Sequence, residues 1–529
     1  MSRPGGHTLA ETVIGHAAST PDKTAIFFRG EEISYAALSA ASADAAKAML
    51  AFGVRNGDRV ALLMGNEPQW VVFALAASMI GAVFCPLNTW YKAEELYWTL
   101  KHSSARLVIS APKFLKTDYR ALFDGLAREK GDLGGAEIVF VDGAESGGAL
   151  LEAFLSRGAS ISDEALKTAR AAVDPDSPAF VLYTSGSTAE PKGVLLNHRG
   201  VVENGYEMAV RRGINGDDRV WLGSPLFYGL GATNALPATY TVGAGLVLQG
   251  HFDAGDAIET IRRTGATVFY GTGNMTRAIL DNPNYAYEKI STLKKGNAGT
   301  VAEYKRLMLE ELGVSGAVPA YGLTECYGNA TVGEPDDPIE AKINTNGRPL
   351  PGMELKIVDP QTGEALPVGE TGLVLLRGRT TPGYLNNSEE TAKALRSDGW
   401  FDTGDLGSLD VDGRFIFHSR LKEVIKSGGI NVSPVEVEQL LSGHRDVRDA
   451  YVVGVGDAVK GELIVAFVDA AGPVSADELK AYVKERAASF KAPHHVFFRN
   501  EEQLPRLASG KVAKHLLAVE ARKELGIGG

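Results

Sequence analysis

The sequence has little cysteine, no cluster of positive charge and no apolar segment near its start. Only two cysteines, Cys85 and Cys326, occur among 529 residues, and neither belongs to a CxxC pair. We therefore expect neither a disulfide framework nor a cysteine-based zinc site. We expect a reducing, cytoplasmic setting instead. The first twelve residues, MSRPGGHTLAET, have no apolar core of a signal peptide, so none is expected.

The charge balance argues against nucleic acid as a partner. Lys and Arg number 54 against 65 Asp and Glu, which gives a formal net charge of −11. A mildly acidic chain without a basic stripe lacks the electrostatic footprint that phosphate backbones require. The excess of acid favours solubility instead.

One uncharged run could be mistaken for a membrane span. Residues 70–87 read WVVFALAASMIGAVFCPL, eighteen residues without a charge. Gly81 and Pro86 interrupt this run, and its middle is only weakly apolar. We therefore predict a buried helix ending near Gly81, followed by a buried strand, and no membrane span.

Apolar strands alternate with helical stretches through the first four hundred residues. The predicted strands are residues 60–64, 82–85, 107–110, 137–141, 179–183, 220–223, 245–248 and 267–270. Helices are predicted over residues 35–52, 69–80, 199–211 and 257–264. This alternation predicts an α/β fold of parallel-rich sheets flanked by helices.

The residue pattern of the sequence changes after about residue 346. Glycine, proline and short strands indicate a small, largely antiparallel, β-barrel-like subdomain over residues 346–420. From residue 432 the pattern is α/β again within about a hundred residues. We predict an N-terminal domain over residues 1–420 and a small, mobile α+β C-terminal domain over residues 421–529.

Residues 183–193, YTSGSTAEPKG, follow an apolar strand and predict a phosphate-binding loop. Small residues let backbone N–H groups approach an anion, hydroxyls add donors, and Lys192 adds positive charge. The loop is not a Walker A motif, because GxxxxGK(S/T) is absent. A flexible turn is the alternative for such a segment on its own.

Further segments carry side chains suited to ATP. Within AYGLTE, Tyr321 offers a flat face for a base, Thr324 a hydroxyl for a phosphate, and Glu325 a hard oxygen ligand for Mg2+. In WFDTGDL, the two carboxylate oxygens of Asp405 suit the two hydroxyls of a ribose. Lys511 lies in LPRLASGKV, where a mobile lysine could meet charge developing at phosphorus.

Taken together, these segments resemble the adenylate-forming superfamily: acyl-CoA and aryl-CoA synthetases, firefly-type luciferases and adenylation domains of peptide synthetases. Five motifs occur in the family's order, and the resemblance covers about residues 9–517. Ala189 replaces the usual glycine of the loop, Ser419 precedes Arg420 where Asp or Gly is usual, and Leu507 replaces a threonine.

The resemblance implies roles for individual residues. Lys511, Thr184 and Glu325 would be catalytic, with Glu325 holding Mg2+, and Lys422 would be the hinge between two domain orientations. Lys426, Ser427, Gly428 and Gly429 would bind CoA in the thioester-forming state. The ATP-binding residues would be Thr184, Ser185, Gly186, Ser187, Thr188, Lys192, Gly299, Thr300, Ala320, Tyr321, Gly322, Thr324, Asp405, Phe417 and Arg420.

The acid-binding wall departs from the family pattern. We expect it to include Phe227, Tyr228, Gly229, Gly273, Asn274 and Gly322. Tyr228 stands where many acyl-CoA synthetases have histidine, and it cannot take up a proton near neutral pH. Residues 224–234 contain no acidic side chain to pair with a substrate ammonium, which argues against an amino acid. An aryl, alicyclic or short to medium acyl acid is expected.

The sequence thus predicts an ATP- and Mg2+-dependent carboxylate–CoA ligase that forms acyl-AMP and then acyl-CoA. Two alternatives stay open: an adenylating enzyme that passes the acyl group to a carrier protein or oxidises its adenylate, and a non-catalytic nucleotide-binding protein on this fold. A homodimer is an expectation by resemblance only, since nothing in the sequence reports an interface.

Overall fold

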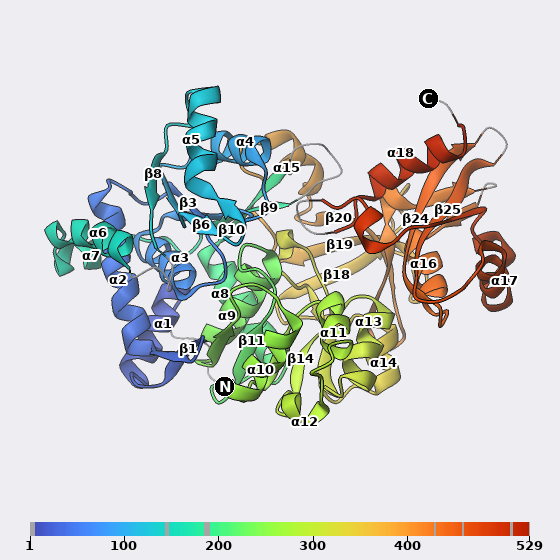
Figure 1. Ribbon diagram of the computed structural model, residues 1–529, viewed down its shortest axis with the longest axis horizontal. Helices are drawn as coiled ribbons and strands as arrows, with labels where there is room; N and C mark the ends of the chain where they lie inside the picture. Colours follow the sequence, from blue (N-terminus) through green and yellow to red (C-terminus); the bar gives the residue numbers. More distant parts are fainter. Residues whose placement is uncertain are drawn as a thin grey trace.

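A computed structural model describes residues 6–142, 148–184, 191–427, 430–457, 460–507 and 511–527. The chain builds two large sheets in its first 350 residues, a smaller antiparallel sheet after them, and a fourth sheet near the C-terminus. In Figure 1 the C-terminal part, coloured orange to red, lies at one side of the molecule beside the strands of the antiparallel sheet.

The first large sheet has six strands, with parallel neighbours except where the last pair turns back. In spatial order the strands are β10 (Lys192–Asn197), β9 (Pro178–Thr184), β4 (Val83–Pro86), β3 (Arg59–Leu63), β5 (Leu107–Ser110) and β8 (Glu137–Phe140). Only β9 and β10 pair antiparallel within it.

The second large sheet has nine strands. Its order is β17 (Arg348–Pro349), β16 (Thr331–Val332), β15 (Gly316–Tyr321), β14 (Lys295–Gly299), β13 (Val268–Tyr270), β11 (Arg219–Leu222), β12 (Gly245–Leu248), β1 (Thr24–Phe28) and β2 (Glu31–Ser34). The central strands run parallel, so their carboxyl ends meet at one edge, where ligand sites of such sheets lie.

Helices begin and end where the sequence supplies capping groups. The Ser34 hydroxyl accepts from Ala37 N at the start of α2, and Gly81, at φ 70°, ends α3 in the left-handed conformation. The helices are α1 (Leu9–Ser19), α2 (Tyr35–Ala51), α3 (Pro68–Ile80), α4 (Ala93–Ser103), α5 (Tyr119–Lys130), α6 (Ala149–Ser156), α7 (Asp163–Ala171), α8 (His198–Arg211), α9 (Leu236–Tyr240), α10 (Ala254–Thr264), α11 (Gly273–Leu280), α12 (Tyr287–Ile290), α13 (Ala302–Arg306), α14 (Ile339–Asn344), α15 (Ser388–Ala394), α16 (Pro434–Ser442), α17 (Ala476–Arg486) and α18 (Lys514–Glu524).

Both large sheets are buried on two faces. In β3, Val60 and Leu62 join the central core with α1–α3, while Ala61 and Leu63 face a second core with α4 and α5. The sheet therefore has helices on both sides, as the predicted α/β fold requires. The uncharged run of residues 70–87 forms the buried helix α3 and strand β4, and no helix in the described ranges is long and apolar enough to span a membrane.

The β-rich part takes the form of a four-stranded antiparallel sheet. Its strands are β18 (Met353–Val358), β19 (Gly372–Gly378), β20 (Phe401–Leu409) and β21 (Phe415–Arg420). The C-terminal sheet has β23 (Ile430–Val432), β22 (Ile425–Ser427), β25 (Gly461–Ala470), β24 (Val447–Asp457) and β26 (His495–Phe498), and a small hairpin joins β6 (Lys113–Phe114) to β7 (Thr117–Asp118).

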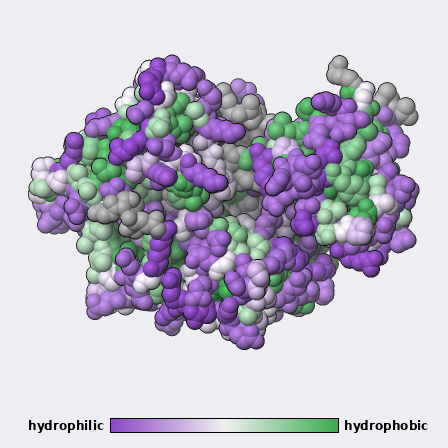
Figure 2. Space-filling model, viewed as in Figure 1, coloured by the Kyte–Doolittle hydropathy of each residue, from purple (hydrophilic) through white to green (hydrophobic). Residues whose placement is uncertain are grey.

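The C-terminal sheet is covered on both faces too. Helices α16 and α17 pack on the face that carries Val452 and Ile464, and α18 packs on the face that carries Val453 and Phe467. The surface in Figure 2 is mostly hydrophilic, with hydrophobic residues scattered over it.

Candidate active site

The predicted phosphate loop joins the ends of an antiparallel strand pair. Thr184 ends β9, Lys192 begins β10, and the two residues face each other in register. Residues 185–190 between them, which include Ser185, Gly186, Ser187 and Thr188, lie outside the described residues. The two ends of the loop are thus fixed by the sheet.

Lys192 is engaged by an acidic residue rather than left free. Its Nζ contacts Glu390 Oε2 and lies 5.4 Å from the centre of the Tyr384 ring. The hydrogen bond from Lys192, helped by Lys393, lowers the pKa of Glu390 to about 2. Lys192, at the start of β10, therefore has an ionised carboxylate as its partner.

Glu325 lies in a short 3₁₀ turn, Thr324–Cys326, just past the end of β15. The Tyr384 hydroxyl donates to Glu325 Oε1 at 3.0 Å, and Thr381 N donates to the Glu325 carbonyl at 2.6 Å. Tyr384 thus contacts both Glu325 and Lys192, which brings the predicted metal ligand and the predicted phosphate lysine to one place.

A buried carboxylate forms the centre of the predicted ribose site. Asp405 is only 2% exposed and faces Arg420 in the register of β20 and β21. Asp405 Oδ2 accepts from the Tyr321 hydroxyl at 2.7 Å, and Oδ1 lies 3.0 Å from Arg420 Nε. Burial raises the pKa of Asp405, while Arg420 and the Tyr321 hydroxyl oppose that rise.

Asp405 Oδ1 is the open acceptor of this group. It is buried, yet no donor among the described residues makes a hydrogen bond to it, since the Arg420 contact is an ion pair only. Buried polar oxygens normally have a hydrogen-bond partner. A ligand hydroxyl would supply one here.

The Tyr321 ring is less available to a base than the sequence suggested. Tyr321 is 3% exposed, and its ring packs 4.5 Å from that of Phe415 and stacks 5.8 Å from that of Phe417, centre to centre. Gly299, with φ +81°, turns the chain toward Thr300, whose hydroxyl donates to Ala320 O at 3.1 Å. Residues 299–300 and 320–321, which are predicted to bind the adenosine of ATP, therefore lie side by side.

The two predicted C-terminal lysines flank the ribose residues. Lys422 lies in a 3₁₀ turn, Leu421–Glu423, that directly follows Arg420. The Lys511 side chain is exposed to solvent on one side and has protein atoms around the rest of it. The loss of hydration and the charge of Arg420 lower the pKa of Lys511, and the charge of Glu423 raises it. Lys511 therefore lies within electrostatic reach of the Asp405–Arg420 pair.

The predicted CoA segment is described only in part. Lys426 N donates to Glu462 Oε2 at 2.6 Å, and Ser427 pairs with Gly461 between β22 and β25. Gly428 and Gly429 lie outside the described residues. The segment thus begins as a strand of the C-terminal sheet.

The predicted acid wall is aromatic. Phe227 is buried, and its ring lies 4.6 Å from that of Tyr228; Trp90 lies 5.6 Å from the first and 5.7 Å from the second. Asn88 Nδ2 donates to the Tyr228 hydroxyl at 3.3 Å, and burial raises the pKa of Tyr228. A Cβ at Gly229 would come 3.5 Å from Thr324 Oγ1, so this wall borders the ATP motif.

Gly273 and Asn274 begin α11 and contact Tyr304. The Tyr304 ring would lie 2.0 Å from a Cβ at Gly273, and its hydroxyl donates to Asn274 Oδ1 at 2.7 Å. The same hydroxyl lies 3.5 Å from Asp449 Oδ1 in β24. These two predicted pocket residues therefore lie where the N- and C-terminal parts meet.

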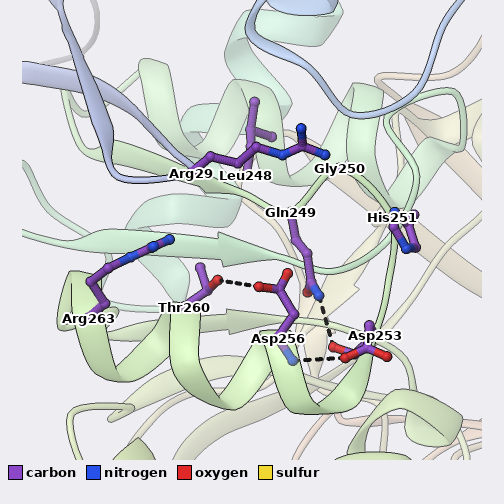
Figure 3. A pocket seen from close by; sticks show the side chains of 9 residues that line it. All are labelled: Arg29, Leu248, Gln249, Gly250, His251, Asp253, Asp256, Thr260 and Arg263. Atoms are coloured by element: carbon purple, nitrogen blue, oxygen red, sulfur yellow. Dashed lines mark hydrogen bonds between the residues drawn. The ribbon is translucent and has the colours of Figure 1, made fainter. Parts of the chain in front are cut away.

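A cavity of about 320 Å³ lies at the carboxyl ends of β1 and β12 (Figure 3). None of the predicted site residues lines it, and its lining is Arg29, Leu248, Gln249, Gly250, His251, Asp253, Asp256, Thr260 and Arg263. Asn66 connects it to the acid wall, since Asn66 N donates to Gly250 O and Asn66 Nδ2 donates to Ser224 O.

Metal binding by protein side chains alone is not supported. The described part of the chain has no group of three or more His, Cys, Asp or Glu side chains arranged to hold a metal ion. Mg2+ commonly uses one or two carboxylates together with substrate phosphates. Glu325, a single carboxylate that shares Tyr384 with Lys192, fits that pattern.

Sequence reasoning missed three residues of this region: Trp90, Asn88 and Tyr384. Each acts through a contact with a residue distant in sequence, such as the 59-residue separation between Tyr384 and Glu325. The one local signal was Trp90, an aromatic residue in a polar turn that remains 46% exposed.

The positions of Lys192, Glu325, Asp405 and Arg420 are consistent with the predicted site of an adenylate-forming enzyme. Comparison with known families agrees: residues 15–385 match the AMP-binding enzyme family, and residues 436–511 match the AMP-binding enzyme C-terminal domain. The chain belongs to the AMP-binding enzyme family, and it is an AMP-forming acid–thiol ligase of the acyl-CoA synthetase type.

Two curated relatives match along nearly the whole chain. It is 32% identical over 532 residues to the putative acyl-CoA synthetase YngI of Bacillus subtilis, covering 97% of this chain and 96% of that protein. It is 36% identical over 512 residues to the 3-[(3aS,4S,7aS)-7a-methyl-1,5-dioxo-octahydro-1H-inden-4-yl]propanoyl:CoA ligase of Mycobacterium tuberculosis, covering 96% of each.

Two crystal structures of one protein, MatB from Rhodopseudomonas palustris, bear on the domain arrangement. Each is 27% identical to this chain and covers 98% of it and 99% of MatB. The ATP-bound form superposes with a TM-score of 0.86 and the apo form with 0.75. The whole-chain arrangement is thus more similar to the ATP-bound form.

Proposed function

We propose that this enzyme ligates a neutral-tailed carboxylic acid to coenzyme A through an acyl-AMP intermediate. The observation that carries the proposal is the buried pair of Asp405 and Tyr321 beside the half-exposed Arg420, with Lys511 within electrostatic reach of Arg420. One oxygen of the Asp405 carboxylate lacks a hydrogen-bond donor among the described residues. A ribose hydroxyl completes that group.

In the first half-reaction, a carboxylate oxygen of the acid attacks the α-phosphorus of ATP. The bond to the bridging oxygen breaks, and pyrophosphate leaves with the electron pair. Thr184 and Lys511 stabilise the negative charge on the phosphate oxygens, and holding the two reactants together lowers the entropic cost. Mg2+ at Glu325, when bound, adds Lewis-acid neutralisation of the phosphates.

In the second half-reaction, the CoA thiolate attacks the acyl carbonyl, and the bond to AMP breaks. The C-terminal domain turns about Lys422 between the two steps, so that Lys511 leaves and residues 426–429 take its place. The greater similarity to the ATP-bound form of MatB supports assigning the present arrangement to the first step.

The acid wall supports a substrate with an uncharged tail. Trp90, Phe227 and Tyr228 present aromatic surface, and residues 224–234 carry no acidic side chain. An ammonium in such a pocket would be costly, because nothing in that segment pairs with it. Aryl, alicyclic and short to medium acyl acids fit this surface.

The test is a panel of benzoates, cinnamates, alicyclic acids and linear acids of graded length, with ATP and Mg2+. Pyrophosphate release and acyl-CoA formation are followed with and without CoA. We expect one class of acid to give CoA-dependent thioester. Acid-dependent pyrophosphate release without thioester would point to a carrier-protein acceptor, and ATP binding without pyrophosphate release from any acid would contradict the ligase.

A further inference from the structure

Asn346 is a buried amide outside every motif of the sequence. It lies two residues after α14 and is 2% exposed. Its Nδ2 donates to Thr300 O at 3.0 Å and to Ala320 O at 3.4 Å, and its Oδ1 accepts from Phe417 N at 3.0 Å. One side chain therefore holds three segments that are distant in sequence.

These are the three segments of the proposed adenosine site. Thr300 follows the Gly299 turn, Ala320 precedes Tyr321 at the end of β15, and Phe417 stacks on the Tyr321 ring. The Thr300 hydroxyl also donates to Ala320 O. A shift of the amide would therefore change the spacing between the turn, the tyrosine and the phenylalanine together.

The backbone of Asn346 is fixed as firmly as its side chain. Its N–H donates to Phe415 O at 2.6 Å, and its carbonyl accepts from the Thr331 hydroxyl at 2.6 Å. These backbone bonds fix the position of the Asn346 Cα, and rotation of the amide would break the three side-chain hydrogen bonds. Asparagine is suited to this place because its short amide presents two donors and an acceptor at once.

We propose that Asn346 is the positioning residue of the adenosine site. It sets the distance between the Thr300 turn, Tyr321 and Phe417, so that its loss weakens ATP binding and base discrimination without touching the acid or CoA. The inference rests on the proposed function, because it places ATP between these segments. It assigns to Asn346 no contact with the reacting atoms.

Two variants test the proposal. Asn346→Ala removes all three side-chain hydrogen bonds, and Asn346→Ser keeps a shorter donor and acceptor. We expect the KM for ATP to rise about tenfold in Asn346→Ala and less in Asn346→Ser. The preference for ATP over GTP should fall, while kcat at saturating ATP and the KM values for acid and CoA stay within about threefold of wild type.

Two controls separate positioning from general loss of stability. Asn344→Ala removes an exposed amide of the same kind, whose Nδ2 donates to Glu340 Oε2 at 3.2 Å, and should change none of these quantities. Lys342→Met removes a buried side chain that donates to Ser315 O and Pro335 O, so it should lower the melting temperature without raising the KM for ATP.

Several outcomes would overturn the inference. An unchanged KM for ATP in folded Asn346→Ala would do so, and so would equal rises for ATP, acid and CoA, or the same ATP defect in Lys342→Met. If Asn346→Ala fails to fold, Asn346→Ser decides by the same criteria. Titration of ATP by calorimetry separates the two failures: wild type that binds ATP but releases no pyrophosphate contradicts the proposed function, while the ATP affinities of the variants still judge Asn346.

Discussion

Replacing Asp405 by asparagine should damage the use of ATP far more than the fold. The substitution keeps the shape of a side chain that is 2% exposed, but it removes the charge beside Arg420 and replaces one acceptor oxygen with a donor. The Tyr321 hydroxyl can still donate to the remaining oxygen. The oxygen that lacks a donor in the described structure is the one we assign to the ribose.

The magnitude follows from the number of hydrogen bonds at stake. A hydrogen bond to a charged group contributes about 1.5–3 kcal/mol, and two ribose hydroxyls give about 3–6 kcal/mol. At about 1.4 kcal/mol per factor of ten, complete loss would lower kcat/KM for ATP by about 10²–10⁴. Asparagine keeps the oxygen that accepts from Tyr321 but lacks the oxygen assigned to the ribose, so we expect a loss of about 10² or more for Asp405→Asn.

The assay is a cycle in which enzyme and nucleotide are both altered. Initial rates of pyrophosphate release are measured with ATP, 2′-deoxy-ATP and 3′-deoxy-ATP for wild type and Asp405→Asn. Wild type should lose about tenfold or more for each missing hydroxyl, while the variant loses under about threefold, because the partner is already absent. Losses that simply multiply would refute the assignment of Asp405 to the ribose.

A matched control lies on the same strand. Asp402 in β20 accepts from Gly404 N at 3.0 Å, and Asp402→Asn should leave kcat/KM for ATP within about twofold of wild type. Burial raises the pKa of Asp405, so kcat/KM for ATP should fall on acidification at a pH above that of an ordinary aspartate. Asp405→Asn should abolish that acid limb.

Three further predictions follow from other contacts. Lys511→Ala should lower acid-dependent pyrophosphate release by about 10² or more but leave thioester formation from supplied acyl-AMP largely intact, and Lys422→Pro should do the reverse; equal losses in both half-reactions would contradict these roles. Tyr384→Phe removes the hydroxyl 3.0 Å from Glu325 and should raise the half-saturating Mg2+ concentration about tenfold, whereas an unchanged Mg2+ titration argues against Glu325 as the ligand. Burial lowers the pKa of Lys305 to about 7, so the unfolded state binds more protons than the folded state between that pH and the ordinary lysine value. The free energy of unfolding, measured in urea, should therefore rise by several kcal/mol from pH 7 to 10 relative to Lys305→Met. Parallel pH curves for the two proteins would exclude this.

Local pattern predicted several strands and helices in the first half of the chain but not others, such as α1, β1 and β2. Strands over residues 107–110 and 245–248 match β5 and β12 at both ends, because an apolar run is bounded there by polar residues or glycine. Helix α10 begins three residues earlier than predicted, since Asp253 caps it by accepting from Asp256 N. Such caps are local, and attention to them would have corrected the boundary.

The arrangement of the strands was beyond the reach of local pattern. Strand β1, near the start of the chain, pairs in parallel with β12, more than two hundred residues later. That pairing depends on which faces can be buried together, and it leaves no mark within either strand. The same limit hid Asn346 and Tyr384, whose importance comes entirely from partners brought near by the fold.

The motif residues were predictable because each carries its own chemistry. Asp405, Arg420 and Tyr321 do meet in space, which the sequence could suggest only through resemblance. The sequence did not show that the Tyr321 ring packs against Phe415 and Phe417, so that its hydroxyl, rather than its face, contacts Asp405.

The placement of Arg420 at the end of β21 has a mechanical consequence. Arg420, which pairs with Asp405, is separated from Lys422 by one residue. The proposed nucleotide site and the proposed pivot therefore lie on the same short segment of the chain. A nucleotide bound at Asp405 and Arg420 would hold this segment at Arg420. Backbone rotation would then begin only after that residue. Lys511 interacts electrostatically with Arg420 and Glu423, the residues on either side of the proposed pivot at residues 421–422, so it lies near that pivot in the present arrangement. If the proposed rotation occurs at Lys422, a bound nucleotide would hold Arg420 in place while Lys511 moves away from it.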